Sequence, residues 1–278
     1  MSSTPRSRTF WPMSELPPVV DAAWLQERLG EGDLVVGDVR GPNAHARGHI
    51  AGSRPLVLGS PPPMSDPEVI EALAKEIGLR LRRHGITGEE RLVLYDRGDG
   101  VGAMPSAQLA ELAGHPKVSV LLGGIAAWPG ELEAGQVELE PVKVQLQPRL
   151  DALPTRAEVE RRLGEEGLAL LDIRTEEEFR GRGGYPCDPR QGHIPGARNL
   201  DVAELARCET VEQVLELVAL PTGSEIAAYC HSGSRSALAV QILPPPVTRR
   251  ATTQARGTSG RAAKISPSRR DPNSQSGV

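Results

Sequence analysis

The sequence predicts an α/β fold with two similar domains, each built on a mainly parallel sheet flanked by helices. Short apolar runs alternate with amphipathic runs along most of the chain, which is the pattern of strand–helix–strand units. The same series of motifs also occurs twice. With 278 residues, the chain exceeds the ~100 to 150 residues of one typical domain. We expect one domain at residues 17–130, a linker at 131–153 and a second domain at 154–243.

The first unit opens with an amphipathic run in which Asp21 is a candidate helix N-cap and Gly30 a stop. The strand that follows ends in Asp38 and Arg40, and a later strand leads into Asp96. A Gly-Gly-x-x-x-Trp segment closes the unit. In chain order the expected elements are a helix at 21–30, a strand at 34–40, a turn at 48–53, a strand at 92–96, a helix at 105–114 and a strand at 118–122.

The second unit repeats this series. Asp38 and Asp172 lie 134 positions apart, and the same 134 positions separate Asp96 from Cys230. The two Gly-His-Ile turns lie 144 positions apart, so the second unit carries a ten-residue insertion, which we place within 180–190. The expected elements are a helix at 155–164, a strand at 168–174, a turn at 192–197, a strand at 226–230 and a helix from about 234 to 243.

Cys230 occupies the most informative position, between a short apolar strand and a helix-like run. A thiolate is the reactive form of Cys, and a helix N-terminus or a nearby Arg lowers the pKa of a Cys from about 8.5 by one or more units. The backbone N–H groups after the Cys are expected to curl around an anion held above the sulfur. The residues of this loop are His231, Ser232, Gly233, Ser234 and Arg235.

Loop length separates two chemistries. Cys230 to Arg235 is Cys-x4-Arg, six residues, whereas phosphatases with a Cys nucleophile use Cys-x5-Arg to wrap a phosphate. Here the sequence resembles the rhodanese family of sulfurtransferases, whose active loop has six residues beginning with the Cys. The resemblance covers roughly residues 17–243. The family includes tandem members in which only the second domain carries the Cys. The resemblance therefore implies that the first domain, with Asp96 in place of the Cys, is inactive.

The resemblance implies a sulfurtransferase in which Cys230 takes a sulfur atom as a persulfide and passes it to cyanide or a thiol. The loop matches neither the thiosulfate type nor the 3-mercaptopyruvate type cleanly. We expect thiosulfate as the donor and keep 3-mercaptopyruvate as the alternative. No metal or organic cofactor is expected. Two other classes stay open: a rhodanese-like binding or regulatory protein without activity, and a Cys-dependent phosphatase or arsenate reductase.

Further site residues follow from the same resemblance. The loop from His231 to Arg235 is expected to bind the anionic donor. In the family an Arg after the Asp-x-Arg segment also binds the donor, but this chain has Glu178 there. Asp172 and Arg174 are expected to form a buried pair that supports the loop. The candidates to replace the missing Arg are Arg180, Arg182 and Arg190. Of these, Arg180 and Arg190 are included among the expected donor-binding residues.

Charge and composition exclude several classes of partner. The net charge is −4, and residues 244–278 alone carry +6, which leaves −10 for the body of the chain. An acidic body argues against a nucleic-acid partner. No apolar run approaches the roughly 18 to 20 residues of a membrane span. The three cysteines form no CxxC pair, which favours a reducing compartment, and we expect a cytoplasmic protein.

The C-terminal tail, 244–278, departs from the pattern of the first unit. It has almost no large apolar residue and is rich in Arg, Ser, Thr and Pro. Such a segment buries too little surface to offset its ordering entropy of about 1 to 2 kcal/mol per residue. We therefore expect disorder after about residue 246. Its composition also leads to the hypothesis of a frameshift near codon 243, with a functional basic tail as the alternative.

Overall fold

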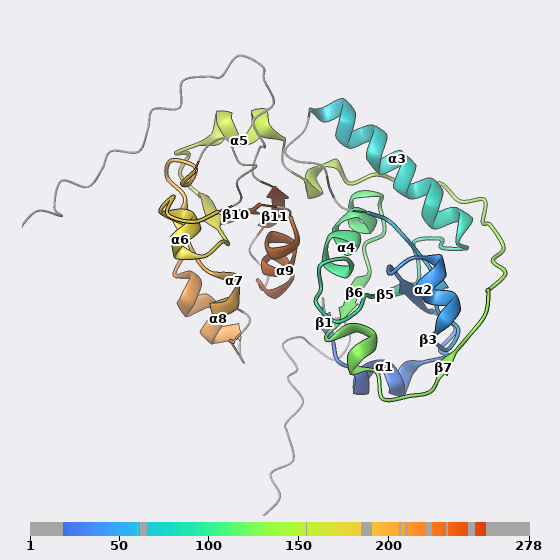
Figure 1. The fold of residues 1–278 in the computed structure, drawn as a ribbon. Coiled ribbons are helices and arrows are strands. Elements are labelled where there is room, and N and C mark those ends of the chain that lie inside the picture. The colour runs from blue at the N-terminus through green and yellow to red at the C-terminus, as the bar shows by residue number, and fades with distance from the viewer. Residues whose placement is uncertain are drawn as a thin grey trace, which may run out of the picture.

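The computed structural model places two α/β units side by side (Figure 1). One unit holds α1 to α4 and the other α5 to α9, so the expected two-domain α/β fold is confirmed. The structure describes residues 19–59, 61, 66–153, 155–184, 191–205, 207–208, 211–220, 224–231, 233–243 and 248–253.

The first sheet has five strands, all parallel, in the order β1-β6-β5-β2-β4. Its central strands are apolar on both faces because helices cover both sides, as is usual for parallel sheets. A separate antiparallel pair joins β3 to β7. The strands are β1 (Val19–Val20), β2 (Leu34–Asp38), β3 (His49–Ile50), β4 (Arg54–Pro55), β5 (Arg91–Tyr95), β6 (Val118–Leu121) and β7 (Leu132–Glu133).

The helices of the first unit begin where the sequence provides caps. Asp21 accepts a hydrogen bond from the backbone N–H of Trp24 at 2.7 Å and so caps the first helix, as expected. The longest helix has a Pro in its first turn, where a missing N–H costs nothing. The helices are α1 (Ala22–Arg28), α2 (Pro42–Arg47), α3 (Pro67–Arg83), α4 (Ala103–Leu112) and the 3-10 turn η1 (Gly124–Ala127).

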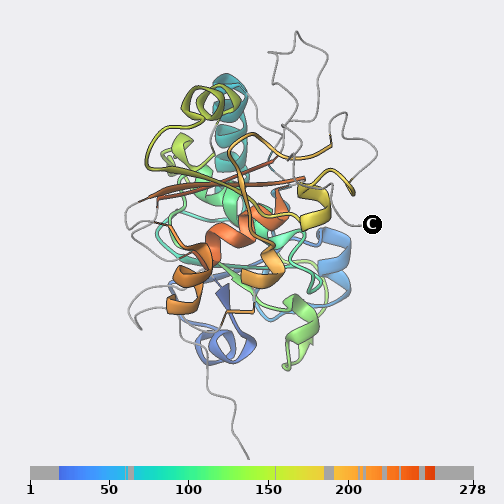
Figure 2. The same cartoon turned by 90° about the vertical axis from the view of Figure 1, so that its left-hand side faces the viewer.

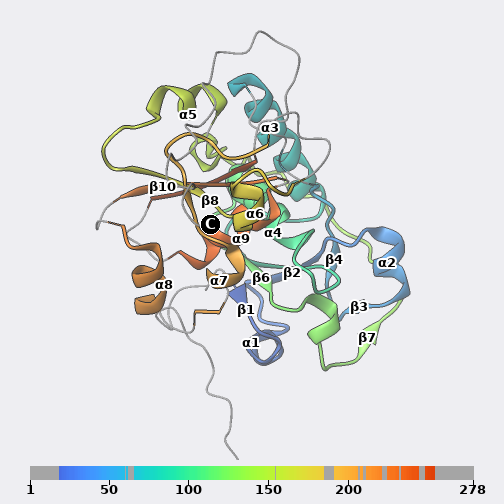
Figure 3. The ribbon, with the colours of Figure 1, turned by 60° about the vertical axis from the view of Figure 1, so that its left-hand side comes forward.

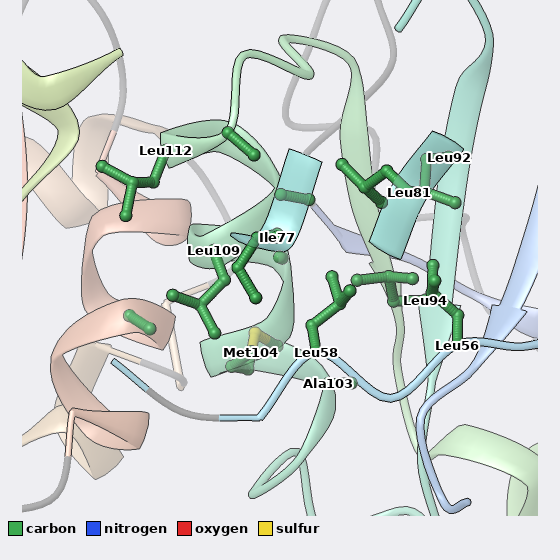
Figure 4. Packing of buried hydrophobic residues seen from close by; sticks show 14 of the residues in the cluster. Leu56, Leu58, Ile77, Leu81, Leu92, Leu94, Ala103, Met104, Leu109 and Leu112 are labelled. Atoms are coloured by element: carbon green, nitrogen blue, oxygen red, sulfur yellow. The ribbon is translucent and has the colours of Figure 1, made fainter. Parts of the chain in front are cut away.

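Helix α4 lies at the centre of the molecule. Every residue of α4 except Glu111 is buried, and a helix that is buried all round must have packing partners on opposite sides. On one side it meets α3 and the first sheet, where Ile77, Leu94 and Leu109 pack together (Figure 4). On the other side it meets α9 of the second unit, whose Ala237 belongs to the same core cluster. The two units therefore share one apolar interface.

The second sheet is parallel throughout, in the order β11-β10-β8-β9. Helix α5 covers one face and α7, α8 and α9 cover the other (Figure 2). The strands are β8 (Leu168–Asp172), β9 (Arg198–Asn199), β10 (Glu225–Cys230) and β11 (Thr248–Thr253). The helices are α5 (Arg156–Arg162), α6 (Glu176–Phe179), α7 (Val202–Leu205), α8 (Val211–Val218) and α9 (Ser234–Ile242), with the 3-10 turn η2 (Leu150–Ala152) before them.

Alternation along β10 decides which way its last side chains point. Ala227 and Tyr229 pack with Val159 of α5 on one face. Ile226 and Ala228 pack with α7 to α9 on the other face. Because successive side chains of a strand point to opposite faces, Cys230 is directed toward the face that α9 covers.

The expectation of disorder after about residue 246 is wrong for six residues. Thr248–Thr253 forms β11, which pairs in parallel with the whole of β10, from Glu225 opposite Thr248 to Cys230 opposite Thr253. Strand pairing uses backbone N–H and C=O groups and therefore needs no large apolar side chain, and three of the six residues are β-branched Thr. The strand also covers an edge of β10 that would otherwise be open. Residues 254–278 lie outside the described residues.

The segment expected as a linker, 131–153, follows the surface of the first unit (Figure 1). It contains β7 and η2, and its backbone is tied to three elements of that unit. The hydrogen bonds run from Gly135 N–H to Ala46 O at 2.9 Å, from Val142 N–H to Arg82 O at 3.0 Å, and from Arg149 N–H to Leu112 O at 2.8 Å.

Candidate active site

Cys230 ends β10 and is fully buried. Its Sγ accepts a hydrogen bond from the backbone N–H of Gly233 at 3.1 Å, so the chain curls back over the sulfur. Helix α9 starts at the next residue, Ser234. The positive end of a helix dipole therefore lies beside the sulfur, where it attracts negative charge.

Gly233 makes this turn possible because its φ is +94°, a conformation that residues with a side chain adopt at a cost. We expect Gly233→Ala to destabilise the protein by about 1–2 kcal/mol and to slow alkylation of Cys230, since the N–H would move away from Sγ. Gly196→Ala is the matched control, because Gly196 also has a positive φ, +83°, with open space around it. Urea denaturation and alkylation rates measure both effects. Equal Cys230 reactivity in the two variants would contradict this role.

Ser236 is a neighbour of the sulfur that sequence reasoning missed. Its Oγ lies 3.6 Å from Cys230 Sγ and donates a hydrogen bond to Gly233 O at 3.0 Å. Ser236 is fully buried. The signal was available, because the first turn of a helix that starts at Ser234 brings a hydroxyl three residues after Gly233 back over the loop.

Arg235 pairs with Glu178 across two elements. Two hydrogen bonds of 2.6 and 2.9 Å join its guanidinium to the carboxylate, so these side chains connect α9 with α6, which overlap in the view of Figure 3. Thr175 caps α6 and forms a reciprocal capping box with Glu178, which fixes the carboxylate from its other side. The hydrogen bonds from Arg235 lower the pKa of Glu178 to about 2.

This pair makes stability depend on pH. The pKa of Glu178 is about 2 in the folded protein against 4.5 as its ordinary value. The contribution of the ionised Glu178 to the stability of the fold is therefore fully present above about pH 4.5 and is lost as the pH falls toward 2. We expect Glu178→Gln to lower the urea midpoint at pH 7 and the gap to the wild type to narrow below pH ~4.5. A constant gap from pH 7 to pH 3, or the same behaviour for the exposed Glu177→Gln, would contradict this.

Asp172 and Arg174 form the expected buried pair at the end of β8. The guanidinium donates to the two carboxylate oxygens at 2.8 and 2.6 Å, and also to Gly192 O at 2.7 Å. Tyr229 lies under the Arg174 guanidinium, and its hydroxyl accepts from Ile194 N–H at 3.1 Å. Burial raises the pKa of Tyr229 well above its ordinary value, so the phenol stays neutral. The pair thus ties the Gly-His-Ile turn to the strand that carries Cys230.

The first unit contains the same arrangement. Arg40 donates to Asp38 at 2.9 and 2.6 Å and to Gly48 O at 2.6 Å. The hydroxyl of Tyr95 accepts from Ile50 N–H at 3.2 Å. These five residues correspond one by one to Asp172, Arg174, Gly192, Tyr229 and Ile194. The repeat inferred from sequence spacing is therefore a repeat of side-chain contacts as well.

Asp96 shows what the position of Cys230 does in this fold. One carboxylate oxygen accepts from Gly98 N–H at 2.9 Å, and the other accepts from the N–H groups of Gly102 and Ala103, both at 3.1 Å. The loop and the start of α4 thus direct several backbone donors at one anion. The backbone N–H groups that follow the central strand β5 therefore form an anion-binding site, and the carboxylate of Asp96 occupies it in the first unit.

The remaining predicted residues are distributed as follows. Arg180 pairs with Glu176 on an exposed face of α6, and Glu178 is almost half a turn away on the face that meets Arg235. His231 is buried next to Cys230. Arg190 and Ser232 lie outside the described residues.

In the part of the chain that the structure describes, no three His, Cys, Asp or Glu side chains are grouped to hold a metal ion. No helix in that part is long and apolar enough to cross a membrane.

The family model of the rhodanese-like domain matches the chain twice, at residues 21–131 and 155–254. The chain belongs to the rhodanese family. The two matches coincide with the two structural units, and the second extends over β11. The match to both units agrees with the repeat of the Asp-x-Arg and Gly-His-Ile contacts described above.

Several rhodanese family members resemble most of this chain. A probable 3-mercaptopyruvate sulfurtransferase of Pseudomonas aeruginosa is 33% identical over 247 residues, covering 77% of this chain and 84% of its own. A thiosulfate sulfurtransferase of Azotobacter vinelandii is 31% identical, covering 82% of this chain and 88% of its own. A solved probable thiosulfate sulfurtransferase is 32% identical with a TM-score of 0.61, covering 76% of this chain and 86% of its own.

The fold is shared more widely within the family. The 3-mercaptopyruvate sulfurtransferase SseA of Escherichia coli has a TM-score of 0.63 at 24% identity, and the match covers 81% of this chain and 93% of that one. At this identity the likeness concerns the fold. This chain and that structure therefore share the fold.

Proposed function

We propose that this protein is a sulfurtransferase that moves a sulfane sulfur from thiosulfate to cyanide or a thiol through a persulfide on Cys230. The observation that carries the proposal is the position of Sγ, which accepts the Gly233 N–H at 3.1 Å at the start of α9. Names of the similar rhodanese family members support it, since all those reported above are thiosulfate or 3-mercaptopyruvate sulfurtransferases.

The reaction has two steps. The Cys230 thiolate attacks the outer sulfur of thiosulfate, the sulfur–sulfur bond of thiosulfate breaks, and sulfite leaves with the bonding electron pair. The enzyme then carries a persulfide whose terminal sulfur is negative at neutral pH. Cyanide or a thiolate attacks that terminal sulfur, forming thiocyanate or a new persulfide, and the Cys230 thiolate is released. This is covalent catalysis with substrate release between the steps.

The loop supports the persulfide by binding its negative charge. The N–H of Gly233 and the positive end of α9 supply fixed partial charges that need no reorganisation during the reaction. Asp96 provides a parallel, because the corresponding loop of the first unit binds a carboxylate with three backbone N–H groups. We include His231, Ser232, Ser234 and Arg235 in the donor-binding loop on the basis of the sequence.

Thiosulfate is the donor that we propose, with 3-mercaptopyruvate as the alternative. Relatives at about 30% identity carry both names, so each donor has support among similar proteins. The residues proposed from the resemblance to hold the donor outside the loop are Arg180 and Arg190. Arg180 lies on the exposed side of α6 in an ion pair with Glu176, which makes it a weaker candidate than the loop itself.

The phosphatase alternative is disfavoured by the length of the loop. Cys230 to Arg235 is Cys-x4-Arg, one residue shorter than the Cys-x5-Arg loop that wraps a phosphate. The first unit is proposed to be inactive, since the carboxylate of Asp96 cannot form a persulfide. The cytoplasm remains the proposed compartment, and Cys208 and Cys230 are free thiols in the structure.

Steady-state kinetics test the proposed function. Initial rates of thiocyanate formation, measured against thiosulfate at several cyanide concentrations, are expected to give parallel double-reciprocal lines, because sulfite leaves before cyanide reacts. The same experiment with 3-mercaptopyruvate compares the two donors. Intersecting lines, or no thiocyanate from either donor with a folded sample, would contradict the proposal.

A further inference from the structure

Two opposite charges meet at the edge of the Cys230 loop. Arg235 lies in the first turn of α9, and Glu178 comes from α6, 57 positions earlier in the chain. Their side chains are 27% and 11% exposed, so both are withdrawn from water in part and face each other at its boundary. The contact is bidentate, the geometry in which Arg and carboxylate bind each other most strongly.

Glu178 is fixed more firmly than an ordinary surface carboxylate. Besides Arg235 it accepts the backbone N–H and the hydroxyl of Thr175, both at 3.1 Å. These bonds form the capping box that starts α6. The negative charge is therefore part of the helix start and stays beside Arg235 rather than rotating into water.

The pair changes the electrostatic character of the loop. Arg235 would give the loop a full positive charge, but Glu178 compensates it. The buried ion pair of Arg174 with Asp172 at the end of the neighbouring strand β8 is also internally neutral. Within the described residues, the positive potential at Cys230 then comes mainly from the Gly233 N–H and the start of α9.

We propose that Glu178 is a specificity-determining positioning residue, which compensates Arg235 and thereby restrains the preference of the Cys230 site for highly charged sulfur donors. This inference rests on the proposed function, and it deepens that function by identifying what ranks donors by charge. A dianion such as thiosulfate loses more from the negative charge of Glu178 than a monoanion such as 3-mercaptopyruvate. A neutral reagent is unaffected by this interaction.

Coulomb's law gives the expected ratio. The interaction of Glu178 with a reagent is proportional to the charge of that reagent. Removing the carboxylate charge therefore changes the logarithm of the rate constant twice as much for a dianion as for a monoanion at the same position. With screening by solvent, we expect gains of about threefold for a monoanion and about tenfold for a dianion.

Alkylation tests the electrostatic part without requiring turnover. Neutral iodoacetamide and anionic iodoacetate are allowed to react with Cys230 in the wild type and in Glu178→Gln, and the modified peptide is quantified. A change in the thiolate fraction affects both reagents equally, so the ratio of the two rates isolates the effect on an incoming anion. We expect the iodoacetate to iodoacetamide ratio to rise about threefold in Glu178→Gln and to fall toward the wild-type value at high salt.

Donor kinetics then test specificity. We expect the kcat/KM for thiosulfate to rise relative to the kcat/KM for 3-mercaptopyruvate in Glu178→Gln. Glu177→Gln is the matched control, because Glu177 lies on the same helix and carries the same charge but pairs with Arg182 on the exposed surface. Glu178→Asp should restore the wild-type ratios in part, since it keeps the charge.

The outcomes separate this inference from the proposed function. An unchanged alkylation ratio in Glu178→Gln, or an equal change in Glu177→Gln, would overturn the inference even if both proteins form persulfide. A shifted alkylation ratio without a persulfide from any donor would overturn the proposed function and keep the electrostatic role. If Glu178→Gln does not fold, Arg235→Gln decides, because it leaves Glu178 uncompensated and must lower the alkylation ratio; an unchanged ratio there also overturns the inference.

Discussion

Replacing Cys230 by Ser is expected to abolish sulfur transfer, with a loss of at least about 10³-fold in kcat/KM. A hydroxyl in this position has no accessible anion at neutral pH and forms no persulfide. The substitution is nearly isosteric, and Sγ makes its described contacts with a backbone N–H and a hydroxyl, so we expect the fold to persist. Thiocyanate formation and circular dichroism measure the two properties.

Cys208→Ser is the control for this substitution. Cys208 is a half-buried thiol near α7 whose Sγ lies 3.7 Å from Glu204 O, and burial raises its pKa, which makes it less reactive. The variant is expected to keep wild-type activity. Activity retained in Cys230→Ser, or lost in Cys208→Ser, would show that the nucleophile has been assigned to the wrong Cys.

Asp172→Ala is expected to have the largest effect on stability, a loss of about 3–5 kcal/mol in the free energy of unfolding. Asp172 is fully buried, and Arg174 is 2% exposed, so the substitution leaves a buried guanidinium without its counter-charge. The Gly-His-Ile turn also loses its anchor on β8 through Gly192. Urea denaturation gives the size of the effect. Glu71→Ala is the control, because it breaks an exposed ion pair with Lys75. We expect it to lower the free energy of unfolding by less than about 1 kcal/mol.

The repeat itself supplies a sharper control for the same prediction. Asp38→Ala breaks the equivalent pair with Arg40 in the first unit. We expect a comparable loss of stability in both variants, but a change in the alkylation rate of Cys230 only in Asp172→Ala. A cost for Asp172→Ala as small as that for Glu71→Ala would contradict the role of the pair, and equal Cys230 reactivity in the two variants would contradict its connection to the loop.

The sequence predicted the features that depend on local pattern and repetition. The strand ending in Asp172 and Arg174, the helix capped by Thr155 and the strand–loop–helix around Cys230 all lie within a few residues of their expected bounds. The pairing of Asp172 with Arg174 was predictable because two residues apart on an extended chain share one face of the strand. Its extension to Gly192 and Tyr229 required the tertiary fold.

The remainder depended on contacts between distant segments. Glu178 was noted as a departure from the family pattern, but its partner Arg235 could not be inferred, because the contact depends on how α6 lies against α9. The strand β11 was not predicted because its segment has no large apolar side chain, whereas its pairing with β10 is made by the backbone. The hydrogen bonds that hold the expected linker, 131–153, along the first unit likewise join it to distant segments.

Cys230 is proposed to carry the transferred sulfur atom, and mass spectrometry tests this role. The intact mass of the full chain is measured before and after thiosulfate, and separately 3-mercaptopyruvate, with peptide mapping and Cys230→Ser as control. We expect a gain of one sulfur atom on the peptide that contains Cys230, its removal by cyanide, and no gain in the variant. A protein that is folded by circular dichroism but gains no sulfur from either donor, or gains it on another Cys, would rule out this role of Cys230.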